Sequence, residues 1–417
     1  MVITRGDSVG GAQLHALDLA RRLRRDRHDV LVVMGTSGPL MAMLAEVGVR
    51  AVVCDSLRRQ LAPIHEVAAV RGLGRIIRAF EPDLVTTHSS KAGMIGRMAS
   101  RFAGVPCIFT AHGWSFADGI PQPSRTIWRG AEMLAAPLAA RIICVSQADY
   151  DLGLRAGIAP KRLVMIHNGL RDEVPPARIE RNGSAPVRIV MVARFAPQKD
   201  HPTLLHAIRS IPGCELDLIG DGPRLPAMRE LASSLGIRNR VRFHGYRADV
   251  SCSLAEADLF VLASNYEGFP LTTLEAMRAG LPTIVSDAGG AAEAVAHGVT
   301  GYVVPPRDIG ALQGQLEAMV KDRDLRRSMG EAARARFLDE FTFERMYETT
   351  YGVYEQVAQS RHAPGAPRRS ALPVPRPSCS GAALAVRGRD LEPPMVFPSM
   401  SGADVKASGR ERSAEWD

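Results

Sequence analysis

The stretch RDEVPPARIERNGSAPVRIVMVAR, residues Arg171–Arg194, divides the chain into two similar halves. Its first part, residues 171–186, combines proline, glycine and charged residues in a way that is typical of a linker. The apolar run VRIVMVAR then begins a new series of short strands. The stretch therefore predicts an N-terminal domain over residues 1–170, a linker over 171–186 and a C-terminal domain over 187–340.

Short apolar runs alternate with amphipathic stretches on both sides of this linker. The first half contains MVIT, VLVVM, AVVC, DLVTT, CIFTA and RIICV, and helices are expected over 12–25, 40–46, 64–79, 92–103 and 124–139. The second half continues with ELDLIG, VRFHG, LFVLAS, PTIVS and GYVVP. Such alternation predicts parallel sheets covered by helices on both faces. The fold class is therefore α/β, with two doubly wound, Rossmann-like domains that face a ligand-binding cleft.

Both ends of the chain carry further expectations. A helix is predicted over residues 341–357, while residues 358–417 are rich in Pro, Ser, Gly, Ala and Arg and are predicted to form a disordered tail. The first strand is very short, which leaves open that the N-terminus is truncated or mis-started. A weakened edge of the first sheet is the expected consequence.

The composition is that of a globular protein. Of the 417 residues, 46% are hydrophobic and 23% are charged, and no apolar run reaches the roughly 18 to 20 residues of a membrane span. None of the six cysteines lies in a CxxC pair and no signal peptide is recognised, so a cytoplasmic protein with reduced cysteines is predicted. The net charge of +8 suits an anionic membrane surface or a phosphorylated substrate, whereas no nucleic-acid-binding motif accompanies it.

The stretch EGFPLTTLEAM, residues 267–277, places two carboxylates around a proline. Pro270 suits the first turn of a helix, so a helix is predicted over 271–279. Glu267 then lies in the preceding loop and Glu275 more than one turn inside the helix. Because a helix N-terminus attracts anions, the arrangement suits a ligand that carries both phosphate and hydroxyl groups, such as a sugar nucleotide.

Two glycine-rich loops follow predicted strands. Gly10 and Gly11 in GDSVGGAQ would let the backbone approach a phosphate or a sugar, although an ordinary strand-to-helix turn is equally consistent with the sequence. Gly220 and Gly222 in IGDGP could shape a nucleotide pocket or form only a turn.

Cations and histidines also follow predicted strands. Arg194 and Lys199 are suited to a diphosphate leaving group, with ordinary surface charge as the alternative. His88 and His112 are both expected to point toward the cleft, and Lys91 is a candidate for holding an acceptor phosphate. No DxD pair or histidine-rich motif suggests a metal site, so no metal and no cofactor is expected.

Together, these motifs resemble the retaining glycosyltransferases of family 4, which have the GT-B fold. The resemblance rests on Glu267 and Glu275 with seven residues between them, LFVLASNYEGFP, ARFAPQKD, IGDGP and GGAQ, and it covers about residues 1–357. Asp200 departs from the family, in which a glycine commonly follows the lysine, and the tail has no counterpart.

The resemblance implies roles for individual residues. Arg194, Lys199, Glu267 and His112 are the implied catalytic residues: the cations hold the diphosphate, Glu267 contacts sugar hydroxyls and His112 lies near the sugar. Glu275 binds the ribose. The remaining implied donor-binding residues are Gly10, Gly11, Gly220, Gly222, Gly268, Phe269, Pro270 and Leu271, and the acceptor-binding residues are Lys91 and His112.

The implied activity is transfer of a sugar from a nucleotide sugar to a hydroxyl of a saccharide or lipid-linked acceptor, with retention at the anomeric carbon. HSSKAGMIGR and AHGWSF resemble segments of bacterial capsule, exopolysaccharide or lipopolysaccharide transferases. A sugar-nucleotide epimerase or hydrolase of the same fold, and a non-catalytic sugar-nucleotide-binding module, remain as alternatives. Two predicted helices are rich in arginine, at Arg21–Arg27 and Arg71–Phe80. They could attach the protein peripherally to the inner face of the plasma membrane, or their arginines could simply be solvated at the surface.

Overall fold

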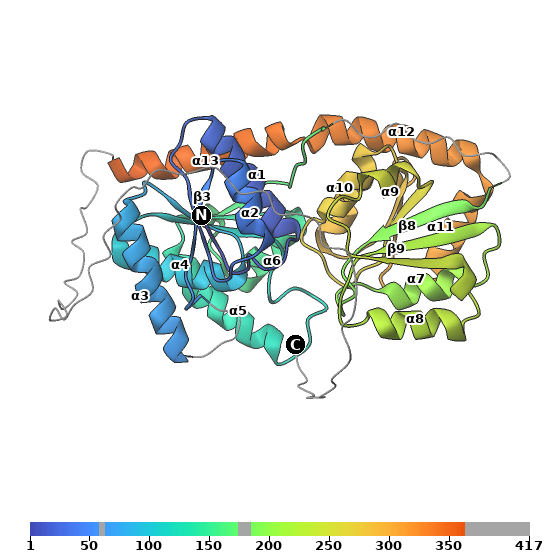
Figure 1. The fold of residues 1–417 in the computed structure, drawn as a ribbon, viewed down its shortest axis with the longest axis horizontal. Coiled ribbons are helices and arrows are strands. Elements are labelled where there is room, and N and C mark those ends of the chain that lie inside the picture. Colours follow the sequence, from blue (N-terminus) through green and yellow to red (C-terminus); the bar gives the residue numbers. More distant parts are fainter. Residues whose placement is uncertain (58–62, 174–184, 363–417) are drawn as a thin grey trace, which may run out of the picture. The chain divides into compact units, whose positions relative to one another are not determined.

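The computed structural model describes residues 1–57, 63–173 and 185–362, which form two parallel sheets and the helices around them (Figure 1). Both sheets belong to one compact unit, Met1–Leu372. Most of the predicted linker, residues 174–184, and the predicted tail beyond His362 lie outside the described residues.

The first sheet has the strand order β3-β2-β1-β4-β5-β6-β7, with parallel pairing. Its strands are β1 (Val2–Ile3), β2 (Leu31–Met34), β3 (Arg50–Val53), β4 (Val85–Thr87), β5 (Cys107–Ala111), β6 (Arg141–Cys144) and β7 (Leu163–Met165). The short β1 lies inside the sheet, because Val2 pairs with both Val33 of β2 and Thr87 of β4. The expectation that a short first strand weakens an edge of this sheet is therefore wrong.

Helices cover both faces of the first sheet, as the alternation predicted. They are α1 (Gly11–Arg25), α2 (Pro39–Glu46), α3 (Pro63–Phe80), α4 (Ser90–Ala103), α5 (Ser124–Ala135) and α6 (Gln147–Ala156), with 3-10 turns η1 (Ala136–Leu138) and η2 (Pro160–Arg162). Successive strand side chains point to opposite faces. Accordingly, Ile3 packs in one core with α1 and α2, whereas Val2 packs in another with α3 and α4.

The second sheet has the order β10-β9-β8-β11-β12-β13. Its strands are β8 (Val187–Val192), β9 (Cys214–Ile219), β10 (Val241–Gly245), β11 (Leu259–Leu262), β12 (Thr283–Ser286) and β13 (Gly301–Val304). The helices are α7 (His201–Ile208), α8 (Leu225–Ser234), α9 (Ser251–Ala255), α10 (Leu271–Arg278), α11 (Ile309–Lys321) and α12 (Arg323–Glu340), with η3 (Arg238–Arg240) and η4 (Gly289–Ala294).

The last described helix, α13 (Phe343–His362), returns to the first half of the chain. It lies beside α1 (Figure 1), where the Arg22 guanidinium stacks on the Tyr347 ring at 4.5 Å and the Tyr347 hydroxyl donates to Asp26 at 2.6 Å. Its apolar face joins the core of the first domain. The helix extends to His362. Residues 358–362 are therefore helical, and the prediction that the disordered tail starts at residue 358 is wrong for them. Across the described residues, no helix has both the length and the apolar character that crossing a bilayer requires.

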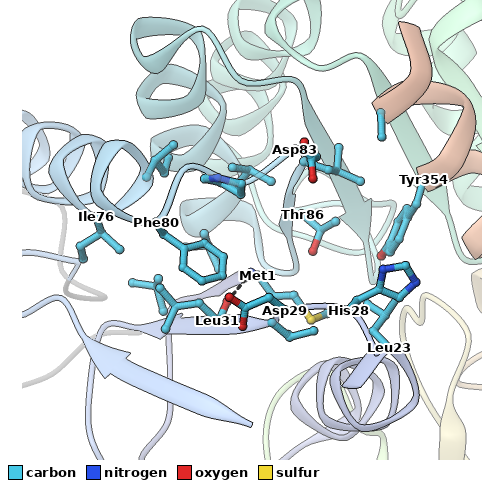
Figure 2. A pocket seen from close by; sticks show the side chains of 18 of the residues that line it. Met1, Leu23, His28, Asp29, Leu31, Ile76, Phe80, Asp83, Thr86 and Tyr354 are labelled. Carbon is cyan, nitrogen blue, oxygen red and sulfur yellow. Dashed lines mark hydrogen bonds between the residues drawn. The ribbon is translucent and has the colours of Figure 1, made fainter. Parts of the chain in front are cut away.

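A mainly apolar hollow of about 600 Å³ lies beside β1 (Figure 2). Met1 and Leu31 contribute to its wall, and the Met1 amino group donates to the Leu31 carbonyl at 2.7 Å. These residues begin the strands, so the hollow is at the amino ends of the first sheet. Open α/β sheets bind ligands at the opposite, carboxyl ends.

Each sheet has one point at which the strand order reverses. These points lie between β1 and β4 in the first sheet and between β8 and β11 in the second. The crevice at such a point, outside the carboxyl ends, is the usual ligand site of this architecture. The loops that follow these four strands carry many of the residues that the sequence singled out.

Candidate functional site

A cleft pocket of about 760 Å³ takes its lining from loops of both sheets. Ten predicted residues line it, namely Gly10, Gly11, His112, Lys199, Glu267, Gly268, Phe269, Pro270, Leu271 and Glu275. The predicted residues Lys91, Arg194, Gly220 and Gly222 do not belong to this lining. The fold therefore brings together residues from widely separated motifs, and it divides the predicted set.

Glu267 is the most highly connected side chain of the cleft pocket. It is buried, and its carboxylate forms an ion pair with the Lys199 ammonium group. The Ser264 hydroxyl donates to it at 2.6 Å and the Gln198 amide at 3.3 Å. These three donors fix the carboxylate in one orientation at the wall of the pocket. A ligand that draws Lys199 toward a phosphate must therefore share that charge with Glu267.

The start of α10 opens into the same pocket. Pro270 is the N-cap, and its side chain makes no capping hydrogen bond to the first turn. The orphan amides of this turn and the helix dipole favour a negative charge there. Glu275 lies further along α10, and burial raises its pKa to about 7. The predicted placement of one carboxylate before the helix and one inside it is confirmed.

The Glu267–Pro270 loop packs directly against the first half of the chain. A Cβ atom on Gly268 would lie 2.6 Å from the His112 carbonyl oxygen, so only glycine fits at this approach. The Asn168 amide donates to the Phe269 carbonyl at 2.8 Å, and both groups are buried. Sequence reasoning missed Asn168 because the preceding strand, β7, was not recognised. The NG pair that follows LVMIH was the available signal.

The second glycine-rich loop supports the first loop of its own sheet. Gly220 and Gly222 have φ angles of +145° and +152°. Cβ atoms there would lie 2.0 Å from the Ala193 carbonyl oxygen and 2.5 Å from that of Phe195. These glycines therefore hold the loop that presents Arg194, whose side chain is exposed.

Lys91 is occupied elsewhere. It is buried and forms an ion pair of 2.7 Å with Glu66 of α3. Because a neighbouring carboxylate already neutralises this ammonium group, the arrangement gives no direct support to the predicted phosphate contact.

Three histidines from distant parts of the chain meet beside the cleft pocket. His15, His88 and His112 each offer a ring nitrogen, and these nitrogens all lie within 4.8 Å of one another. His112 lines the pocket, whereas His88 is fully buried behind it and is not part of the lining. Burial lowers the pKa of His15 to about 4 and holds the pKa values of His88 and His112 well below their usual range. All three imidazoles are therefore neutral at neutral pH.

The histidine group is the kind of cluster that sequence spacing does not reveal. The Nδ1 atom of His88 lies 3.4 Å from Nε2 of His112, and Nε2 of His88 lies 3.2 Å from the Thr86 hydroxyl. Neutral imidazoles can bind a transition metal, and they can equally form a hydrogen-bonded chain. A hydrogen-bonded chain accounts for the contacts of His88 with His112 and with Thr86 without a metal ion.

Two family models match successive parts of the chain. "Glycosyltransferase Family 4" matches residues 9–174 and "Glycosyl transferases group 1" matches residues 178–336. The first segment covers the first sheet except β1, and the second covers the second sheet and most of its helices.

Curated relatives match much of the same region. The UDP-Gal:alpha-D-GlcNAc-diphosphoundecaprenol alpha-1,3-galactosyltransferase of Escherichia coli is 28% identical over 338 residues, which cover 76% of this chain and 86% of that protein. The lipopolysaccharide core biosynthesis glycosyltransferase LpsE of Rhizobium meliloti is 30% identical over 171 residues, covering 41% of this chain and 50% of that protein.

Solved structures share the fold at low sequence identity. Anabaena Alr3699/HepE in complex with UDP and glucose has a TM-score of 0.74 at 23% identity, and the match covers 85% of this chain and 98% of that one. The sucrose-phosphate synthase of Thermosynechococcus elongatus has a TM-score of 0.75 at 20% identity, covering 86% and 98%. With both domains matched in order, the chain belongs to glycosyltransferase family 4 and has the GT-B fold.

Proposed function

We propose that this glycosyltransferase moves a sugar from a nucleotide-sugar donor to a hydroxyl of a saccharide or lipid-linked acceptor in bacterial surface polysaccharide synthesis, with retention at the anomeric carbon. One arrangement carries the proposal: the Lys199–Glu267 ion pair lies in the same pocket as the uncapped start of α10, with Glu275 further along that helix. This arrangement offers a cation and helix amides to a diphosphate and one carboxylate each to a sugar and a ribose.

The names of similar proteins suggest where to begin. The Escherichia coli relative uses UDP-galactose and a diphosphoundecaprenol-linked sugar, and the Anabaena neighbour was solved with UDP and glucose. Uridine diphosphate sugars are therefore the first donors to test, and a lipid-linked saccharide is the first acceptor class.

The proposed mechanism places the reaction on one face of the donor sugar. Arg194, Lys199 and the amides at the start of α10 stabilise the departing diphosphate, and a diphosphate oxygen takes the proton of the incoming hydroxyl. Glu267 holds sugar hydroxyls, and His112, with its backbone against Gly268, is placed beside the sugar. Catalysis is then mostly positioning and electrostatic preorganisation.

A transfer assay with a panel of nucleotide sugars tests the proposal. We expect Lys199→Ala to weaken nucleoside diphosphate binding about tenfold or more, because a charged contact is lost, and to depress turnover strongly. Lys161→Ala, at an exposed lysine outside the cleft pocket, is the matched control. Release of free sugar or of an isomer without an acceptor would favour the hydrolase or epimerase, and donor binding without turnover would favour the binding module.

We further propose that the transfer needs no metal ion. The diphosphate charge is met by Arg194, Lys199 and helix amides, which replaces the role of a divalent cation. Activity should therefore survive excess EDTA. The three-histidine group gives this test a definite alternative: loss of activity in EDTA and its recovery on adding zinc would assign a metal to that group.

The proposed location is the cytoplasm, with peripheral attachment to the inner face of the membrane. On α3, Arg71, Arg75 and Arg78 are exposed, and Val67 is half exposed. By contrast, Arg22 of α1 is paired with Asp26 at 3.1 Å, so α3 is the better membrane candidate of the two predicted helices. Basic residues near an anionic surface contribute about 1 kcal/mol each. Binding to anionic vesicles at low salt, lost at high salt, is expected, and no binding at low salt would contradict attachment.

A further inference from the structure

We propose that a second pair of connected pockets binds the acceptor, and that they take a sugar bearing a phosphate or diphosphate group. The sugar lies in a pocket beside Asp149 and its phosphate lies beside Arg155. This inference rests on the proposed glycosyl transfer, and it adds the acceptor subsite and the chemical class of the acceptor.

The first of these pockets, here called the Asp149 pocket, has a volume of about 440 Å³. Glu267 lines both this pocket and the cleft pocket, so the two pockets adjoin at this residue. Asp149 and Leu152 of α6 contribute from one sheet, and Tyr266 and Asp287 contribute from the loops of the other. The volume lies within the range of roughly 300 to 1,000 Å³ that is usual for small-molecule sites. An acceptor sugar here would lie next to the proposed donor sugar.

Asp149 is the observation that points to a ligand. Its side chain is only 3% exposed, and its Oδ2 atom has no hydrogen-bond partner among the described residues. A buried carboxyl oxygen without a donor is costly. Burial raises the pKa of Asp149 to about 7, which reflects that cost. The Oδ2 atom is closed to water in this conformation, so a sugar hydroxyl would supply the missing donor once the Asp149 side chain turns toward the pocket that it lines.

The second pocket, here called the Arg129 pocket, has a volume of about 360 Å³ and adjoins the first. Asp118, Leu152 and Arg155 line both. Three arginines surround the Arg129 pocket, and Asp118 is its one acidic lining residue. This excess of guanidinium groups suits a phosphate or diphosphate.

The three arginines of this pocket differ in whether their guanidinium groups already have hydrogen-bond or ion-pair partners. Arg125 is paired with Asp118, and Arg129 donates to the Arg155 carbonyl at 3.3 Å. The Arg155 side chain is exposed, and within the described residues it makes no hydrogen bond or ion pair. Arg155 is thus the guanidinium most available to a ligand, and it lies in the wall that the two pockets share.

The charges of the two pockets set the orientation of the acceptor. The Asp149 pocket has four acidic residues against two arginines, so it repels an anion and accepts hydroxyl donors. The Arg129 pocket has the opposite balance. An acceptor that is neutral at its reacting sugar and anionic at its other end therefore fits only one way round.

Isothermal titration calorimetry with soluble sugar 1-phosphates tests the assignment. Glucose, galactose, mannose and N-acetylglucosamine 1-phosphates are titrated into the protein alone and into its complex with a nucleoside diphosphate. We expect at least one to bind both forms, about tenfold or more tightly than its methyl glycoside. Absence of such binding from the wild-type protein would overturn the proposal, whereas failure of every nucleoside diphosphate to bind would instead contradict the proposed transferase function.

Two variants separate the two ends of the acceptor. Arg155→Gln should weaken sugar phosphate binding about tenfold without changing nucleoside diphosphate affinity. Arg101→Gln, at an exposed arginine of α4 outside both pockets, should change neither. Asp149→Asn should weaken the sugar phosphates but leave inorganic diphosphate binding unchanged. Because Arg155 is exposed, its variant tests the site even if Asp149→Asn fails to fold.

Two further outcomes would sink the idea. Equal affinity of wild type and Arg155→Gln for every sugar phosphate would remove the phosphate site. Tighter binding of glucuronic acid than of any sugar phosphate would show that the anion recognised is a carboxylate.

Discussion

Glu275 keeps a carboxylate in a place that is unfavourable for a negative charge. Burial raises its pKa from 4.5 to about 7, and the nearby Arg278 only partly opposes this effect. Between these two pH values the folded protein holds a proton that the unfolded chain has released. This linkage makes the free energy of unfolding fall as pH rises from 4.5 to 7.

Glu275→Gln should therefore separate stability from binding. At pH 8 we expect the variant to be more stable than the wild type, by on the order of 1 to 3 kcal/mol, whereas at pH 4.5 the two should be alike. Its affinity for nucleoside diphosphate should fall, because an amide cannot replace a carboxylate that accepts ribose hydroxyls. Thermal melts at the two pH values and calorimetric titration measure both effects.

The exposed Glu331 of α12 provides a control for this experiment, since Glu331→Gln should shift neither quantity. If Glu275→Gln melts like the wild type at pH 8 and binds nucleotide equally well, the carboxylate has neither the cost nor the role assigned to it.

At the scale of elements, the loop before α10 is fitted to the turn after β5. A Cβ atom on Gly268 would overlap the His112 carbonyl oxygen. Gly290 in turn approaches Gly268, since a Cβ atom added to Gly290 would lie 1.9 Å from the Gly268 carbonyl oxygen. Three segments from two sheets thus meet through their backbones. Such an approach is possible only without side chains.

Gly268→Ala should displace this loop without unfolding either domain. We expect transfer activity to fall at least about tenfold, because small displacements of positioning groups are costly to catalysis. Gly314→Ala is the matched control: this glycine lies inside α11 with no heavy atom near the new Cβ. It should leave activity unchanged and raise stability by up to about 1 kcal/mol, since alanine favours the helix. Normal activity in Gly268→Ala would show that the close approach is not needed.

Elements with a clear hydrophobic periodicity and clear boundary residues could be predicted from the sequence. The helix after Pro270 and the restart at Val187 belong to this class, because proline and the linker composition mark their beginnings. The end of α5 was less predictable: the helix stops at Ala135 and a 3-10 turn with Pro137 follows, where a continuous helix to Ala139 was expected. The short strand β7 carries only three residues, which is too few to establish a period.

The site was predictable where residues share a motif and not where they meet only in space. Glu267 and Lys199 were found because each follows a recognisable strand. The neutral histidine group and the free oxygen of Asp149 depend on contacts between distant segments, which a single sequence does not encode in its spacing.

At the scale of the whole molecule, Glu293 of the second half makes hydrogen bonds to the first turn of α6 in the first half. It belongs to η4 of the second half, and its two oxygens accept hydrogen bonds from the Gln147 and Ala148 amides at 2.8 Å each. These amides begin α6 of the first half, and the His167 ring lies 2.8 Å from the same carboxylate. Burial tends to raise the pKa of Glu293, but hydrogen bonds from His167, Ala148 and Gln147 outweigh it and lower the pKa overall.

This contact should help to hold the two halves together in the arrangement that closes the cleft pocket. Glu293→Gln has only one acceptor oxygen, and its NH₂ group would face a backbone amide, so at least one of the three contacts is lost. We expect catalytic efficiency (kcat/KM) to fall about tenfold or more, and small-angle scattering to report a larger radius of gyration.

Because the carboxylate has a lowered pKa, the wild-type contact should persist at all pH values above 4.5 and weaken only as pH falls through that lowered value. Glu317→Gln is the control, since Glu317 pairs with Lys321 within one helix, α11. Unchanged scattering and unchanged activity in Glu293→Gln would mean that the domains close without this contact.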